Sequence, residues 1–131
     1  MITITKKPLE FIFSRKITSG AGMTGAVAVF IGTVRNFNKG KKVRAIEYTA
    51  YEKMAKKDLA RIAAECMKKW AVLKVDIAHR TGLLKVGEAS IITIVTASHR
   101  KDAYAASRYI IEEIKKTTPI WKKEIVNEIK N

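Results

Sequence analysis

The spacing of apolar side chains changes along this 131-residue chain, and that change limits the kinds of element that it can form. Across residues 52–70, apolar positions recur every three or four residues, the pattern of a helix with one buried face (Leu59, Ile62, Ala63, Cys66, Trp70). A second stretch of this kind runs from about residue 100 to 116, and Pro119 prevents it from continuing much further. The sequence therefore predicts two long amphipathic helices.

Strand-like runs surround these two helices. They are rich in β-branched residues or alternate between apolar and polar positions, and they cover residues 2–5, 26–34, 43–51, 72–80 and 89–98. The polar stretch 36–42 is expected to be an exposed loop, and residues 81–88 a connection with turn glycines. Pro8 suits the first turn of an additional helix that includes Leu9, Phe11 and Ile12 and ends before the loop at residues 19–22, and no structure is predicted for the tail from Ile120. The order β-α-β-β-α-β-β-α predicts an α+β fold with a mostly antiparallel or mixed sheet in one domain.

Basic residues outnumber acidic ones by more than two to one. Lys and Arg total 26 and Asp and Glu total 12, which gives a formal net charge of +14 at pH 7. A surplus of this size favours an anionic partner: a nucleic acid, a phosphorylated small molecule or an acidic protein surface. No apolar run approaches the ~20 residues of a membrane span, the start MITITKKPLEF lacks the apolar middle of a signal peptide, and one cysteine cannot form an internal disulfide. We therefore expect a cytoplasmic protein without membrane contact.

Three conspicuous residues are expected to be structural. Cys66 lies on the apolar face of the first predicted helix, where a thiol behaves as a small hydrophobe with a raised pKa. His79 ends a predicted strand, where a hydrogen-bonded structural role is the usual one. Trp121 is interpreted as a core anchor. Two histidines without a third ligand at suitable spacing indicate no metal site, and no cofactor-binding motif is present, so we expect neither metal nor cofactor.

Five cationic residues are candidates for an anion site. His99 and Arg100 stand where a predicted strand ends and the second helix begins, so free backbone N–H groups face the same space. Lys115 and Lys122 flank Pro119, and a turn there would bring both ammonium groups round one pocket, where they could act as acid–base groups. Arg35 ends the strand that contains GTVR and offers a bidentate donor. The alternatives are structural: a capped helix start with a solvated arginine, and lysines that complement a helix dipole.

Five segments in this order resemble one known family. They are GAVAVFIGTVRN (25–36), EYTAYEKM (47–54), HRTGLLKVGE (79–88), SHRKDAYAA (98–106) and KKTTPIWKKE (115–124). Together they make the chain similar to the large, catalytic subunit of molybdopterin synthase over about residues 8–124, within a single domain of residues 1–131. Members of that family commonly run further past the last segment, whereas this chain has a short tail that ends at Asn131.

The resemblance implies an α/β hammerhead fold and a homodimer within a heterotetramer. A small ubiquitin-like sulfur-carrier subunit would bind at each end and insert its C-terminal Gly-Gly thiocarboxylate into a pocket. The enzyme would be a sulfurtransferase that moves two sulfurs to cyclic pyranopterin monophosphate and so makes molybdopterin. Two other functions stay open from the sequence. A basic nucleic-acid-binding module is suggested by the charge, and an inactive scaffold for the small subunit by the short tail.

The resemblance also assigns residues. Lys115 and Lys122 match the catalytic lysines of the family. The substrate pocket of the family corresponds here to Thr33, Val34, Arg35, His99, Arg100, Lys115, Lys122, Lys123 and Glu124. Arginine, histidine and a helix N-terminus suit an anionic substrate, and a chain without a usable thiol needs sulfur from a partner.

Overall fold

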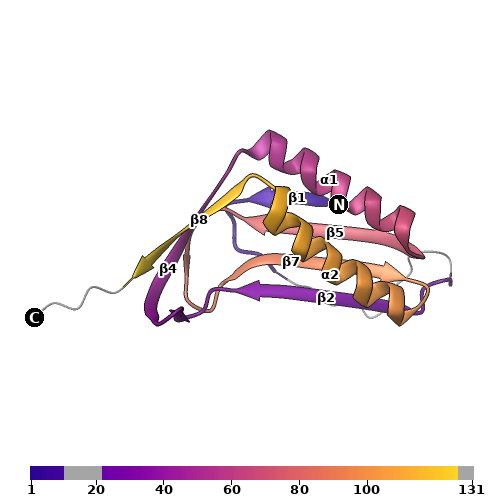
Figure 1. The fold of residues 1–131 in the computed structure, drawn as a ribbon, viewed down its shortest axis with the longest axis horizontal. Helices are drawn as coiled ribbons and strands as arrows, with labels where there is room; N and C mark the ends of the chain where they lie inside the picture. Colours follow the sequence, from indigo (N-terminus) through magenta and orange to yellow (C-terminus); the bar gives the residue numbers. More distant parts are fainter. Residues whose placement is uncertain (11–21, 127–131) are drawn as a thin grey trace, which may run out of the picture.

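The larger of two sheets forms the base of the molecule in this computed structural model, which describes residues 1–10 and 22–126. Its four strands are β1 (Ile2–Thr5), β5 (Val72–Arg80), β7 (Ala89–Ala97) and β2 (Ala26–Thr33), in the order β1-β5-β7-β2 (Figure 1). β1 pairs with β5 in parallel, and the other two pairings are antiparallel. The predicted α+β class with a mixed, mostly antiparallel sheet is confirmed.

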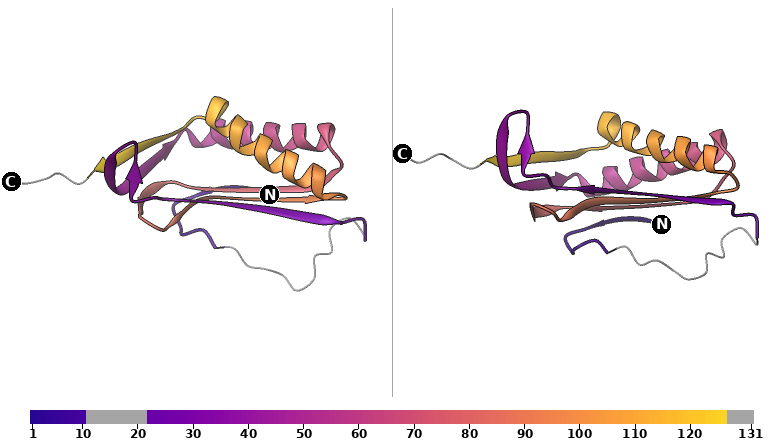
Figure 2. Two further views of the ribbon diagram at one scale, coloured as in Figure 1. Left: turned by 60° about the horizontal axis from the view of Figure 1, so that its bottom comes forward. Right: turned by 90° about the horizontal axis from the view of Figure 1, so that it is seen from below.

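Both long helices cover the same face of this sheet (Figure 2). They are α1 (Glu52–Lys69) and α2 (Arg100–Thr117), and each ends within one residue of its predicted end. α1 buries Ala55, Leu59, Ile62 and Cys66, so the predicted apolar face points at the sheet. α2 ends because Thr118 is extended and Pro119 follows it. None of the helices in the described part of the chain is long and apolar enough to cross a membrane.

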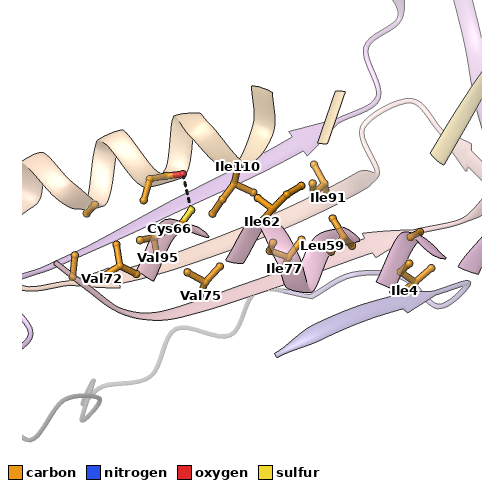
Figure 3. Packing of buried hydrophobic residues seen from close by; sticks show 14 residues of the cluster. Ile4, Leu59, Ile62, Cys66, Val72, Val75, Ile77, Ile91, Val95 and Ile110 are labelled. Carbon is orange, nitrogen blue, oxygen red and sulfur yellow. Dashed lines mark hydrogen bonds between the residues drawn. The ribbon is translucent and has the colours of Figure 1, made fainter. Parts of the chain in front are cut away.

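The main core lies between the two helices and the sheet (Figure 3). Its largest fully buried side chains include Leu59, Ile62, Ile77 and Ile110, each of which stabilises the fold by about 1.5–3 kcal/mol through burial. Cys66 is fully buried among them, and its Sγ lies 3.9 Å from the carbonyl oxygen of Ala106. Burial raises the pKa of this thiol to about 11, so Cys66 is a core residue, as the sequence indicates.

A second sheet projects beyond the helices and forms the other half of the site described below (Figure 1). Its central strand, β4 (Lys41–Ala50), pairs with β3 (Phe37–Asn38), β6 (Gly82–Lys85) and β8 (Ile120–Val126). A small core of Val34, Val43, Ile46 and Leu84 holds it together. All of its pairings are antiparallel.

This sheet corrects several expectations. Residues 36–42 are a β-hairpin and not a loop, because Lys39 and Gly40 adopt positive φ angles of 49° and 80°, as a tight two-residue turn requires. Residues 81–88 contain β6, and the tail from Ile120 forms β8. Trp121 is 58% exposed, so the interpretation as a core anchor is wrong. The helix predicted from Pro8 is absent at residues 8–10, and its remainder lies outside the described residues.

Candidate active site

A cavity of about 730 Å³ lies where the two sheets meet the C-terminal end of α2. Apolar side chains from β2, β4, β7 and α2 form part of its wall. Its polar lining consists of Thr33, Arg35, Asn38, Tyr48, His79, Ser90, Lys115, Lys122 and Glu124. With three basic side chains (Arg35, Lys115 and Lys122) against one carboxylate, the cavity has an excess of basic groups and suits an anionic ligand.

The turn that follows α2 brings Lys115 and Lys122 to this cavity. Lys115 lies in the last turn of α2, and the N–H of Thr118 closes the helix on the carbonyl oxygen of Ile114 at 3.2 Å. Pro119 then directs the chain into β8, which runs antiparallel to β4 with Lys122 opposite Tyr48. Both lysines line the cavity although they come from different elements.

Asp58 of α1 holds this turn in place from outside the cavity. Its Oδ2 accepts hydrogen bonds from the hydroxyls of Thr117 at 2.8 Å and Thr118 at 2.7 Å. Its Oδ1 accepts a third from Arg61 Nε at 3.0 Å. Burial acts to raise the pKa of Asp58, but the hydrogen bonds from both threonines and Arg61 outweigh it and hold the pKa below 3.8. The carboxylate therefore connects α1 to the segment between the two lysines.

Replacing Asp58 with asparagine is expected to lower the free energy of unfolding by about 2 kcal/mol at pH 7, because the charged acceptor of three hydrogen bonds is lost. Since the folded pKa lies below the unfolded value of 3.8, the carboxylate stabilises the fold above that pH. This contribution disappears as the pH falls through the folded pKa, so the difference between wild type and Asp58→Asn shrinks in acid.

Urea unfolding of both proteins between pH 7 and pH 3 measures this difference. Glu112→Gln is a suitable control, because it removes the exposed pair with Arg108, at 2.7 Å, from the other helix. That control is expected to cost less than about 0.5 kcal/mol. A difference for Asp58→Asn that stayed constant with pH would contradict the assigned role of its charge.

Three further predicted site residues, Thr33, Val34 and Arg35, lie at the end of β2, and only two of them line the cavity. Thr33 and Arg35 line the cavity, helped by an irregular register between Gly32 and Thr33 that redirects the end of β2. Val34 does not: it is 3% exposed and belongs to the second core. Its backbone bonds to Glu88 and Gly87 tie the end of β2 to the turn after β6.

Two other predicted site residues, Lys123 and Glu124, lie on opposite faces of β8. Glu124 lines the cavity and accepts a hydrogen bond from Asn38 Nδ2 at 2.9 Å. Lys123 is exposed and is not part of the cavity wall, because adjacent residues of a strand point to opposite faces.

His99 and Arg100 do not reach this cavity within one copy of the chain. His99 is the N-cap of α2, Arg100 is its first residue, and both side chains are exposed. Lys115 lies at the opposite end of the same helix, about 24 Å away along the axis at 1.5 Å per residue. One copy therefore brings together Arg35, Lys115 and Lys122, but not the complete set of predicted cations.

Sequence reasoning did not place Asn38, Tyr48, His79 and Ser90 at this site. Tyr48 and Asn38 reach it through the second sheet, whose pairings connect distant segments of the chain. His79 was assigned only a structural role. Within the described residues, no cluster of three or more His, Cys, Asp or Glu side chains could hold a metal ion.

Comparison with known proteins identifies the family. A family model described as "MoaE protein" matches residues 4–117. The chain belongs to the MoaE family. It is 38% identical over 128 residues to a molybdopterin synthase catalytic subunit from Pyrococcus abyssi, which covers 97% of this chain and 86% of that relative. A Bacillus subtilis protein of the same name is 50% identical over 101 residues, covering 77% of this chain and 64% of that relative.

A solved structure of this family has the same fold. The crystal structure of molybdopterin synthase from Staphylococcus aureus superposes with a TM-score of 0.86 at 41% sequence identity. The match covers 96% of this chain and 91% of that chain. The resemblance expected from the five segments is therefore confirmed, together with the fold, the enzyme class and a role in molybdenum cofactor biosynthesis.

Proposed function

We propose that this MoaE-family chain transfers two sulfurs from the thiocarboxylated C-terminus of a small ubiquitin-like subunit to cyclic pyranopterin monophosphate, forming molybdopterin. The observation that carries the proposal is the convergence of Lys115 and Lys122 on one cationic cavity with Arg35. Cys66, the only thiol, is fully buried and has a pKa of about 11, so the sulfur comes from a partner.

The cavity residues divide into binding and acid–base roles. Arg35 binds the substrate phosphate through its planar guanidinium, and Thr33 supports it from the same strand end. Lys115 and Lys122 polarise the carbonyl of the thiocarboxylate and transfer protons. The thiocarboxylate sulfur bonds to a substrate carbon, an oxygen substituent of that carbon leaves with a proton from a lysine, and water then cleaves the carbon–sulfur bond to the carrier, which ends as a carboxylate. Each carrier supplies one sulfur. Glu124, held by Asn38, lies two residues after Lys122 on the same face of β8 and supplies the carboxylate of the cavity wall.

A homodimer explains why His99 and Arg100 lie away from the cavity of their own copy. β2 is an edge strand of the larger sheet, and Val29, Phe30 and Ile31 are about 40% exposed along it. Antiparallel pairing of two β2 edges about a two-fold axis would set the start of one β2 beside the end of the other. Since His99 and Arg100 follow the strand paired with the start of β2, this arrangement would bring the partner's His99 and Arg100 toward Arg35.

Val29→Asp tests this dimer. Two aspartates facing each other across the two-fold axis repel, so the variant is expected to sediment as a 14.7 kDa monomer while wild type sediments at twice that mass. Val29 does not line the cavity, so a loss of turnover in the variant would reflect the missing partner copy. Leu83→Asp, at another exposed apolar position on β6, is the control and is expected to stay dimeric. A dimeric Val29→Asp protein would rule out this interface.

The small subunit would complete a heterotetramer, with its C-terminal tail in the cavity. The basic hairpin of Lys39, Lys41 and Lys42 beside the cavity suits an acidic partner surface.

The proposed chemistry also favours a location in the cytoplasm. A thiocarboxylate donor and an unpaired cysteine both suit that reducing compartment.

A single-turnover assay tests the function. The chain is mixed with a thiocarboxylated ubiquitin-like carrier and cyclic pyranopterin monophosphate, and the dithiolene product is followed. Product formation supports the proposal. A stable complex without product would indicate an inactive scaffold, and the absence of both complex and product, with salt-dependent binding to generic nucleic acid, would indicate a nucleic-acid-binding module.

A further inference from the structure

His79 is a buried titratable side chain at the cavity for which the proposed reaction has no role. It is 5% exposed and lies near the end of β5, on the same face as Val75 and Ile77, which point into the core. Its ring packs edge-on against Tyr48, with centroids 5.2 Å apart and planes at 70°. Both rings form part of the wall that Lys115 and Lys122 also line.

One hydrogen bond determines which ring nitrogen carries the proton. Nδ1 lies 2.8 Å from the carbonyl oxygen of Arg80, and a carbonyl oxygen only accepts, so Nδ1 is the donor. Burial lowers the pKa of His79 below 6.5, and the bond to Arg80 only partly offsets this effect. The ring is therefore neutral at physiological pH, and Nε2 carries a free lone pair.

Nε2 remains available to a ligand. It has no hydrogen-bond partner in the described part of the chain. Among the described residues, Thr93 Oγ1 is the only side-chain nitrogen or oxygen atom that lacks both solvent access and a hydrogen-bond partner. Because Nε2 also lacks a partner but is not such an atom, it must be accessible from open space. The open space beside this ring is the cavity.

Nε2 of His79 differs from the other neutral acceptors of this cavity, which belong to hydroxyl or amide groups that also donate, because in this tautomer Nε2 can only accept. In their charged forms Arg35, Lys115 and Lys122 only donate, and one carboxylate oxygen of Glu124 accepts a hydrogen bond from Asn38. These cations suit the anionic end of a substrate, but they leave the N–H groups of a pterin ring without a partner. A buried donor left unpaired costs about 1–3 kcal/mol, so such a ring needs an acceptor here.

We propose that His79 is a substrate-contacting residue, whose Nε2 accepts a hydrogen bond from a ring N–H or amino group of a pterin substrate. The proposal rests on the proposed function, because that function supplies the pterin. Tyr48 holds the imidazole from the second sheet and the Arg80 carbonyl fixes its tautomer, so the acceptor is oriented before the substrate binds.

Two amide substitutions separate this role from a structural one. His79→Asn places an amide near Nδ1, where it can still donate to the Arg80 carbonyl, but provides nothing at Nε2. His79→Gln places its amide oxygen near Nε2 and loses the bond to Arg80. If Nε2 contacts the substrate, Asn is the more damaging change for binding, and if His79 only supports the fold, Gln is the more damaging change for stability.

The experiment measures the Kd of each full-length protein for cyclic pyranopterin monophosphate by calorimetry, together with thermal unfolding. We expect His79→Asn to raise Kd about 10-fold and His79→Gln about 3-fold, with the unfolding temperature of the Asn variant nearly unchanged. His79→Phe, which keeps an aromatic ring against Tyr48 and has no acceptor, is expected to behave like Asn. Kd values for Asn and Phe equal to wild type would overturn the assignment.

The outcomes also separate this inference from the proposed function. If wild type binds the pterin and the Asn and Phe variants bind it equally well, only the role of His79 fails. If wild type does not bind the pterin at all, the proposed function fails and the assignment of His79 fails with it.

Discussion

Replacing Lys115 with alanine is expected to reduce single-turnover sulfur transfer by about 10²–10⁴-fold, the usual contribution of one positioned acid–base group. The ammonium group lies in the last turn of α2 and faces the cavity shared with Lys122 and Arg35. Because Arg35 and Lys122 still attract the anionic substrate, substrate affinity is expected to fall far less than the rate constant. The rate constant comes from the single-turnover assay, and the affinity from calorimetry.

Lys116→Ala is the matched control for this prediction. Lys116 is the next residue of the same helix turn, carries the same charge and pairs with Glu113 at 3.6 Å, but it is not part of the cavity wall. Its removal changes helix propensity and net charge as Lys115→Ala does, and turnover is expected to stay within about twofold of wild type. Equal losses in both variants would mean that general charge, and not the position of Lys115, drives the reaction.

Replacing Gly25 with alanine is expected to destabilise the fold by about 3 kcal/mol and to lower the unfolding temperature by about 10 °C. A Cβ at this position would lie 2.0 Å from the carbonyl oxygen of Ser98 and 3.1 Å from its carbonyl carbon. Both are backbone atoms, so the clash is relieved only by moving one chain segment away from the other. Ser98 immediately precedes His99, so the start of α2 would move as well.

Gly32→Ala, within the strand β2 that Gly25 precedes, gives a graded comparison. There an added Cβ would lie 2.8 Å from a side-chain methyl carbon of Ile91, which can rotate or shift more easily than backbone. Thermal unfolding of both variants is expected to show the smaller loss for Gly32→Ala. An equal or larger loss at Gly32 would mean that the contact with Ser98 is not what makes Gly25 necessary.

Elements with strong local signals were predicted accurately from the sequence. α1 and α2 have amphipathic spacing, and Pro119 marks the end of α2, so their bounds agree with the structure to within one residue. β5 and β7 are long and rich in β-branched residues, and they pair as neighbours in the larger sheet. In each case, the residues that determine the element lie within it or next to it.

Elements whose structure depends on distant partners were not predicted. β8 has no marked pattern in IWKKEIV and becomes a strand because β4, more than 70 residues earlier, offers an edge to pair with. β6 is only four residues long, and it is a strand because it also pairs with β4. The local sequence of the hairpin did contain a signal, since Lys-Gly in NFNKGKK adopts the positive φ angles of a tight turn.

The same difference between local and distant signals explains which residues of the candidate site could be predicted. The sequence predicts that Lys115 and Lys122 can reach one pocket, because Pro119 ends the helix between them and the resulting turn is local. His99 and Arg100 lie at the opposite end of α2 from Lys115, so only contacts beyond one copy of the chain could bring them to a cavity, and one sequence does not show such contacts. The sequence predicts only a structural role for His79, because the cavity that its ring borders forms where two sheets meet and has no local signal.

The row of Val29, Phe30 and Ile31 along the open side of β2 has a consequence for the protein inside a cell. Unpaired backbone groups beside exposed apolar side chains form a template onto which other unfolded or partly folded chains can add. A substitution that weakens the pairing of β2 with a second copy in the proposed dimer would therefore first increase aggregation and proteolysis. Less of the protein would then be found in the soluble fraction. Abundance, measured before activity, would reveal such variants.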